Sequence, residues 1–350
     1  MPYELNNKIK ELTPYEPITG DYRIRLDANE SYIQYPKEKL QTALNQGLNR
    51  YPDPYAKKLC ESFSKLYSVK ANNVTAGNGS DELISLIVGA FFTHGDTLLT
   101  LSHDFSMYRF YGNVFGIKTE VFSKKTDLTI DVDALISYIN EHHIAGLIFS
   151  NPCNPTSLSL NREAVIKLVS SVNALVVVDE AYMDFSDQSI LDVCCNYSNV
   201  MVLKTCSKAI GLAAIRLGFA IANDKITKAL RAVKSPYNVN AVTQSIGEIV
   251  LNDDAYVKEC TANLLINKTE LYNEILKLSQ KTNLFEVIYP SSTNFLFIKT
   301  NQSKYIFEEL LKRSIAIRYM GDYIRITTGS KAENKELIEA LKEIVEGCLL

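Results

Sequence analysis

The sequence predicts an α/β fold: a large domain with a mostly parallel sheet flanked by helices, followed by a smaller α+β domain. Between residues 74 and 222, short β-rich runs alternate with helical patterns, as is typical of parallel strands joined by helical crossovers. Residues 175–178 are apolar at every position, which indicates a strand covered on both faces. The length of 350 residues suits two domains.

We divide the chain into three parts. Residues 1–35 are rich in Tyr, Pro, Asn and charge with little periodicity, and we expect an arm that packs on the far domain or on a partner subunit. Residues 36–240 would form the large domain, and residues 241–350 a linking helix with the small domain.

The expected elements follow one another in that order. In the large domain we expect strands at 74–76, 97–101, 117–122, 144–149, 175–178, 199–203 and 217–222, and helices at 132–139 and 161–172, the second capped by Asn161. Beyond them we expect a helical region at 241–278, strands at 285–289, 294–299, 315–318 and 323–328, and helices at 303–313 and 334–345.

Composition excludes several classes of function. The chain is 46% hydrophobic with a net charge of −3, so no basic field exists to hold nucleic acid or an anionic membrane. Its seven cysteines form no C-x-x-C pair and are not spaced with its four histidines as zinc ligands, which predicts reduced thiols and no metal. We find no signal-peptide pattern and no apolar run near the roughly 18 residues of a membrane helix. We therefore expect a soluble, cytoplasmic protein.

A glycine turn follows the first strand of the large domain. Gly77 and Gly79 precede Ser80, Asp81 and an apolar helical pattern, so we expect a helix with Ser80 as its N-cap. Such a helix start suits a phosphate, although an ordinary capped helix explains the same residues. The third glycine of the dinucleotide fingerprint and the Walker lysine are both missing.

Lys208 carries the main chemical hypothesis. It follows a predicted strand, directly after Thr205 and Ser207, and Arg216 comes eight residues later. A lysine with a lowered pKa can form a Schiff base, and hydroxyls with an arginine can hold a phosphate. Pyridoxal 5'-phosphate (PLP) needs both, whereas most lysines are simply solvated.

Other polar or aromatic residues also follow strand ends. Tyr108, Asn154 and Asp179 come after the strands at 97–101, 144–149 and 175–178, so that all would lie at one rim with Lys208. Core packing of Tyr108 and turn capping by Asp179 are the simpler explanations. Alternation in 323–327 leaves Arg325 facing either solvent or a cleft.

Together these residues resemble the PLP-dependent aminotransferases of fold type I, and within them the histidinol-phosphate aminotransferase branch. The resemblance covers nearly the whole chain. Its motifs are Leu26-Asp27-Ala28-Asn29-Glu30, Tyr51-Pro52-Asp53-Pro54, Gly79-Ser80-Asp81-Glu82, Asn151-Pro152-Cys153-Asn154-Pro155-Thr156, Val178-Asp179-Glu180-Ala181-Tyr182, Ser207-Lys208-Ala209, Ala214-Ile215-Arg216-Leu217-Gly218, Pro236-Tyr237-Asn238-Val239-Asn240 and Arg325-Ile326-Thr327.

The resemblance implies a role for each matching residue. Lys208 would bind PLP covalently and act as the base, Asp179 would pair with the ring nitrogen, and Tyr108 would stack on the ring. Asn154 and Tyr182 would contact the phenolic oxygen. The phosphate would be held by Ser80, Asp81, Thr205, Ser207 and Arg216, and by Tyr51 of a partner subunit in a homodimer. The substrate would contact Arg325, with Arg318, Asn29 and Tyr15 as further contacts.

Two positions depart from the family pattern. Ser157 stands where the family has glycine after Asn-Pro-Thr, so a positive φ there is more costly. The connection from Arg318 to Arg325 is also short for this branch.

The implied reaction is transamination of L-histidinol phosphate with 2-oxoglutarate, giving imidazole-acetol phosphate and glutamate in histidine biosynthesis. A threonine-phosphate decarboxylase or an aromatic amino-acid aminotransferase of the same fold is the alternative. A non-catalytic PLP-binding regulator is less favoured because Lys208 is present, and a nucleotide-binding dehydrogenase because its glycine fingerprint is incomplete.

Overall fold

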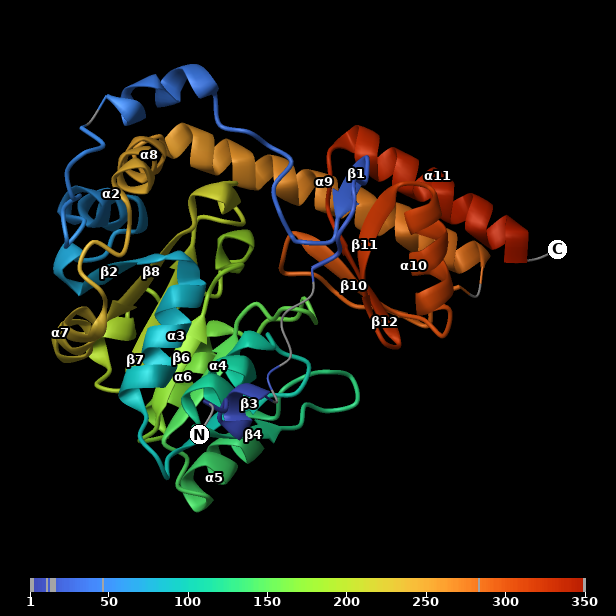
Figure 1. Ribbon diagram of the computed structural model, residues 1–350. Coiled ribbons are helices and arrows are strands. Elements are labelled where there is room, and N and C mark those ends of the chain that lie inside the picture. Colours follow the sequence, from blue (N-terminus) through green and yellow to red (C-terminus); the bar gives the residue numbers. More distant parts are fainter. Residues whose placement is uncertain (1–2, 11, 13–16, 46, 283, 349–350) are drawn as a thin grey trace.

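A seven-stranded sheet forms the centre of the large domain (Figure 1). The computed structural model describes residues 3–10, 12, 17–45, 47–282 and 284–348. In spatial order the strands are β2 (Val74–Asn78), β8 (Leu217–Ala222), β7 (Val200–Thr205), β6 (Leu175–Asp179), β5 (Gly146–Ser150), β3 (Thr97–Leu101) and β4 (Lys118–Phe122). Only β8 runs antiparallel to its neighbours, which confirms the predicted mostly parallel α/β sheet.

Helices cover both faces of this sheet because its strands are apolar on both sides. Val177 of β6 packs in one core with α3 (Gly79–Phe91) and α7 (Asp224–Val233). Its neighbours Val176 and Val178 face the opposite core. That second core includes α2 (Lys57–Tyr67), α5 (Val132–Glu141), α6 (Arg162–Ser170) and α8 (Ala241–Leu251). A further helix, α4 (Met107–Phe115), packs beside α3.

The small domain is built on a five-stranded sheet. Its spatial order is β1 (Ile24–Leu26), β11 (Ile315–Met320), β12 (Tyr323–Thr327), β10 (Phe295–Lys299) and β9 (Val287–Ile288). Helices α10 (Ser303–Lys312) and α11 (Lys331–Cys348) pack against it. β1 pairs in parallel with β11, so this part of the predicted arm contacts the far domain.

The long helix α9 (Asp254–Lys281) connects the two domains (Figure 1). Leu264 packs with Tyr182 of the large domain, whereas Leu271 and Ile275 lie in the small-domain core. The helical region expected at 241–278 is present as two helices, because α8 ends at Leu251 and the Asp253 side chain caps α9 by accepting from the Tyr256 N–H.

The remaining elements are short. They are the helix α1 (Asn7–Lys10) and the 3₁₀ turns Lys37–Leu44, Ala71–Asn73, Met183–Phe185, Cys194–Asn196 and Ala213–Ile215. The strand expected at 285–289 is only Val287–Ile288.

Candidate active site

A cavity of about 470 Å³ lies at the rim where the parallel strands of the large sheet end. Residues of the arm, the large domain and the small domain line it: Ala28, Asn29, Glu30, Ser80, Asp81, Phe105, Tyr108, Ser150, Asn154, Asp179, Ala181, Tyr182, Thr205, Ser207, Lys208, Ala213, Ala214, Arg216 and Arg325. The cavity therefore brings together most of the predicted site residues.

Three predicted residues are not among those lining the cavity. Tyr51 is 81% exposed and stacks on Tyr237, with ring centroids 4.5 Å apart. Arg318 lies on β11 directly opposite Arg325 of β12, but it does not line the cavity. Tyr15 lies outside the described residues.

Lys208 follows β7 and extends across the cavity towards the arm. Its Nζ donates to the Ala28 carbonyl at 3.0 Å and lies 5.9 Å from the centre of the Tyr182 ring. Burial, and secondarily the charge of Arg325, lowers the pKa of Lys208 to about 8. An amine with such a pKa has a much larger neutral, and hence nucleophilic, fraction near neutral pH than an ordinary lysine.

Asp179 ends β6 with its carboxylate pointing into the cavity. The side chain accepts from the Tyr108 hydroxyl at 2.9 Å and from the Ala181 N–H at 3.1 Å. Burial raises the pKa of Asp179 to about 7 despite these bonds. The bond to the Ala181 N–H means that Asp179 does cap the following turn, as the alternative explanation predicted. A buried carboxylate of this kind also favours a cationic partner.

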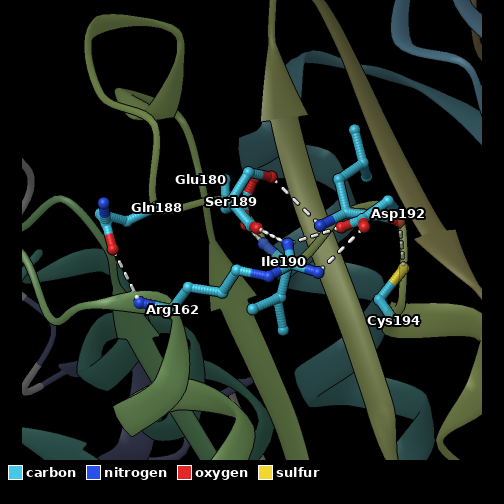
Figure 2. Close-up of polar contacts among 8 residues, drawn as sticks. Arg162, Glu180, Gln188, Ser189, Ile190, Asp192 and Cys194 are labelled. Atoms are coloured by element: carbon cyan, nitrogen blue, oxygen red, sulfur yellow. Dashed lines mark hydrogen bonds and ion pairs between the residues drawn. The ribbon is translucent and has the colours of Figure 1, made fainter.

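Glu180, the next residue, does not line the cavity but anchors the loop that follows β6 (Figure 2). It accepts from the Ser189 hydroxyl at 2.6 Å and from the Ile190 N–H at 2.9 Å. Arg162 ties the same loop down through the Ser189 carbonyl and the Asp192 carboxylate. This network fixes the chain on which Asp179 and Tyr182 lie.

The opposite end of the cavity is rich in donors. Thr205 and Ser207 are joined by their hydroxyls at 3.1 Å, and Arg216 Nη2 lies 3.0 Å from the Asp81 carboxylate. A Cβ on Gly79 would come within 2.7 Å of Arg216 Nη2, so any side chain there would displace the guanidinium.

The predicted N-cap at Ser80 was wrong. Gly79 already belongs to α3, and Asn78 occupies the cap position. Because Gly79 adopts a φ of +79°, the chain turns directly from strand to helix. The Asn78 N–H donates to Glu82 Oε2 at 2.6 Å, so Glu82 satisfies the helix start.

Arg325 faces the cavity rather than solvent. Its guanidinium donates to Asn154 Oδ1 at 2.5 Å and to the Asp27 carbonyl at 2.6 Å, and lies 5.4 Å from the centre of the Phe295 ring. One side chain thereby joins the small sheet, the arm and the Asn-Pro loop. Sequence reasoning did not predict this contact, because its partners are far apart in the chain.

Asn29 connects the arm to Tyr182. Its side-chain amide donates to the Tyr182 hydroxyl at 2.9 Å, and its backbone N–H donates to Thr327 Oγ1 at 3.0 Å. Burial raises the pKa of Tyr182 to about 12, so this phenol stays protonated.

Ser157 adopts the glycine-like conformation despite its side chain. Its φ is +62° and it is fully buried. The hydroxyl donates to the Pro290 carbonyl at 2.9 Å, and the N–H donates to the Cys153 carbonyl at 2.9 Å. Both Asn–Pro bonds of this loop are cis.

Some residues that line the cavity were not singled out from the sequence. Phe105 and Ser150 come at or just after strand ends, the same signal that located Tyr108 and Asn154. Glu30 ends the motif Leu26-Asp27-Ala28-Asn29-Glu30, but nothing in the sequence indicated that this residue lines the cavity.

The fold and this cavity define a PLP-dependent enzyme of fold type I. A family model of the class I and II aminotransferases matches residues 22–341. The histidinol-phosphate aminotransferase of Clostridium novyi is 40% identical, over 95% of this chain and 95% of its own. That of Clostridium kluyveri is 38% identical over 97% of each chain. The chain therefore belongs to the class I and II aminotransferase family.

A solved structure shares the fold. It is that of histidinol-phosphate aminotransferase from Sinorhizobium meliloti in complex with pyridoxal 5'-phosphate, with a TM-score of 0.87 over 98% of both chains and 22% identity.

The residues of the cavity fit PLP in their chemistry. Lys208 supplies an amine for the aldehyde, Asp179 a buried carboxylate for the ring nitrogen, and Arg216 with the hydroxyls of Thr205 and Ser207 donors for the phosphate. Across the described part of the chain, we find no group of three or more His, Cys, Asp or Glu placed to hold a metal. None of the helices described combines the length and apolar character needed to cross a bilayer.

Proposed function

We propose that this chain transfers the amino group of L-histidinol phosphate to 2-oxoglutarate, producing imidazole-acetol phosphate and glutamate in histidine biosynthesis. The observation that carries the proposal is a single cavity holding a neutralisable lysine, a buried carboxylate and two arginines, Arg216 and Arg325. The names of the relatives at 38–40% identity support the substrate.

The chain's own residues would divide the work. When bound, PLP supplies an electron-withdrawing ring that accepts the electron pair left when a proton leaves the substrate carbon. Lys208 Nζ would act as the base that takes this proton from the substrate and later gives it back. Asp179 holds the proton on the ring nitrogen, and Tyr108 orients Asp179 through its hydroxyl. Asn154 and Tyr182 would bind the phenolic oxygen.

Two anions must be accepted in turn, a phosphate monoester and a dicarboxylate. Arginine suits both because its planar guanidinium forms paired bonds with either group. We assign this task to Arg325, which already binds Asn154 and faces the cavity. Asn29 would act by fixing Tyr182, and Arg318 is left without an assigned contact to substrate because it does not line the cavity.

We also propose a homodimer with shared sites, in the cytoplasm. Large apolar side chains that are exposed support it: Leu44, Leu48, Tyr51, Tyr55, Val233 and Tyr237, of which Tyr51 and Tyr237 stack on each other. Such a surface is typical of an interface, and Tyr51 would reach the phosphate in the partner's cavity. The unpaired cysteines suit a reducing compartment.

The test separates this reaction from its rivals. PLP-loaded protein is given L-histidinol phosphate without a keto acid, and imidazole-acetol phosphate is measured by mass spectrometry. We expect about one product per site, and continuous turnover once 2-oxoglutarate is added. Threonine phosphate and phenylalanine are run in parallel, with Lys208→Ala as the inactive control. Release of CO₂ from threonine phosphate, or faster turnover of phenylalanine, would assign the alternative instead.

A further inference from the structure

A lysine and a cysteine contact each other behind the loop that carries Asn154. Lys124 Nζ lies 3.1 Å from Cys153 Sγ, and both groups bond to the His103 carbonyl, at 3.1 Å and 3.3 Å. Cys153 is 3% exposed. The proposed transamination uses neither side chain, and neither lines the active-site cavity.

A second cavity gives a small molecule access to this pair. It has a volume of about 420 Å³ and is lined by Lys124 and Cys153 together with the exposed residues Lys125 and Thr129. Those exposed residues place its mouth at the surface. A reagent of the size of water or hydrogen peroxide can therefore reach the sulfur without entering the active site.

The charges around Lys124 favour reaction at the sulfur first. Burial alone would lower the pKa of Lys124, but the charges of Cys153 and Asp104 outweigh burial and raise it. Lys124 is therefore an ammonium group, which peroxide does not oxidise, so the neighbouring sulfur is the group that reacts first.

We propose that Cys153 and Lys124 form a reversible sulfenamide cross-link driven by peroxide. Hydrogen peroxide transfers one oxygen to the Cys153 sulfur, giving a sulfenic acid, and is reduced to water. Lys124 Nζ then attacks the sulfur: the S–N bond forms, the S–O bond breaks, and the hydroxyl leaves as water with a proton from the amine. A thiol reductant cleaves the S–N bond and restores both side chains.

The two groups are already placed for the second step. Lys124 Nζ lies 3.1 Å from the Cys153 sulfur, so the neutral amine can attack without movement of the backbone. The cross-link draws Cys153 towards Lys124, and Asn154, the next residue, holds Arg325. Activity should therefore fall in proportion to the cross-linked fraction, although the link itself forms whether or not the proposed reaction is correct.

The experiment is peptide mass spectrometry of the PLP-loaded protein after treatment with hydrogen peroxide. We expect the peptides of Lys124 and Cys153 to be joined, with a mass two hydrogens below their sum, and the link to disappear with dithiothreitol. Cys260, which is equally buried but contacts the Ser31 hydroxyl instead of an amine, is the internal control and should form no link.

Two variants complete the test. Lys124→Arg keeps the positive charge but cannot form the link, so Cys153 should proceed to the sulfinic acid and activity should not recover with dithiothreitol. Cys153→Ala should keep its activity under peroxide. The proposal is overturned if Cys153 of the parent chain stays reduced, if it becomes sulfinic acid as fast as in Lys124→Arg, or if the joined peptides retain an added oxygen.

Discussion

Asp179 is buried and Lys208 half-buried, and the loss of contact with water disfavours the charged form of both groups. The pKa of Asp179 rises from 3.8 to about 7, and that of Lys208 falls from 10.5 to about 8. Each group suits the chemistry because its protonation state is easily changed near neutral pH. The same property costs stability, since an ionised carboxylate without a cationic partner is unfavourable in a protein interior.

The first prediction concerns Asp179→Asn in protein without PLP. Between about pH 4 and pH 7 the folded Asp179 keeps a proton that the unfolded chain has lost, so its contribution to stability falls as pH rises. Asparagine removes this dependence. Above about pH 7 we expect the variant to be more stable than the parent, on the order of a few kcal/mol, with the gap closing towards about pH 4.

Urea unfolding across this pH range measures the effect, with the exposed Asp322→Asn as the control. A constant difference between Asp179→Asn and the parent at every pH would contradict the raised pKa. The same variant loaded with PLP should lose roughly 10²–10⁴-fold in turnover, because asparagine cannot hold the proton on the ring nitrogen.

The second prediction concerns the reactivity of Lys208. An ordinary lysine has a pKa of about 10.4, whereas burial lowers the pKa of Lys208 to about 8. In protein without PLP, reductive labelling of Lys208 by an aldehyde should therefore reach half its maximal rate near about pH 8. Peptide mass spectrometry gives the rate, with the exposed Lys335 as internal comparison. Labelling of both lysines with the same pH profile would show that Lys208 is not perturbed.

At the scale of the element, the start of α3 determines the shape of the cavity end that we propose to hold the phosphate. Gly79 combines a positive φ with close approach to Arg216. Helix starts of this kind present backbone N–H groups to an anion, and a side chain on Gly79 would displace the guanidinium. The glycine is needed for conformation and for space.

The third prediction separates these two needs. Gly79→Ala and Gly321→Ala both place alanine at a positive φ, +79° and +68°, but a Cβ at Gly321 meets nothing within 4 Å. Each should lose about 1–2 kcal/mol of stability. Only Gly79→Ala should also weaken the binding of PLP, measured by titration of the protein without cofactor. Equal affinities in the two variants would mean that Arg216 adapts to the added methyl group.

The elements also mark the boundary of what sequence could predict. Strand ends can be predicted from hydrophobic runs, and that alone placed Tyr108, Asn154, Asp179 and Lys208 at one rim. The break before α9 had a signal in Asn252-Asp253, a usual cap sequence. The bond between Arg325 and Asn154 had none, because it depends on how a distant hairpin docks on the large domain.

At the scale of the whole molecule, the cavity exists only because both domains meet. Arg325 brings the small sheet to the Asn-Pro loop, and the Ser157 hydroxyl adds a bond to Pro290. The serine thus compensates for its strained φ with an interdomain contact that glycine could not make. The described part of the chain supplies most of the donor set, but the predicted phosphate contact from Tyr51 requires a second copy.

The last prediction tests that second copy. Tyr51 is exposed and stacks on Tyr237, which suits a residue that enters its partner's cavity. If the sites are shared, Tyr51→Ala weakens PLP binding and Lys208→Ala abolishes activity, each in a homodimer.

A hybrid of the two has one site with both native residues. Mixing equal amounts under conditions that exchange subunits should therefore restore up to about a quarter of the parental activity per site. If each site used Tyr51 of its own chain, each site of the hybrid would carry one of the two substitutions, and no activity would return beyond that of Tyr51→Ala alone. Size-exclusion chromatography with light scattering, run on the same mixture, establishes that a dimer is present and so distinguishes unshared sites from failure to exchange.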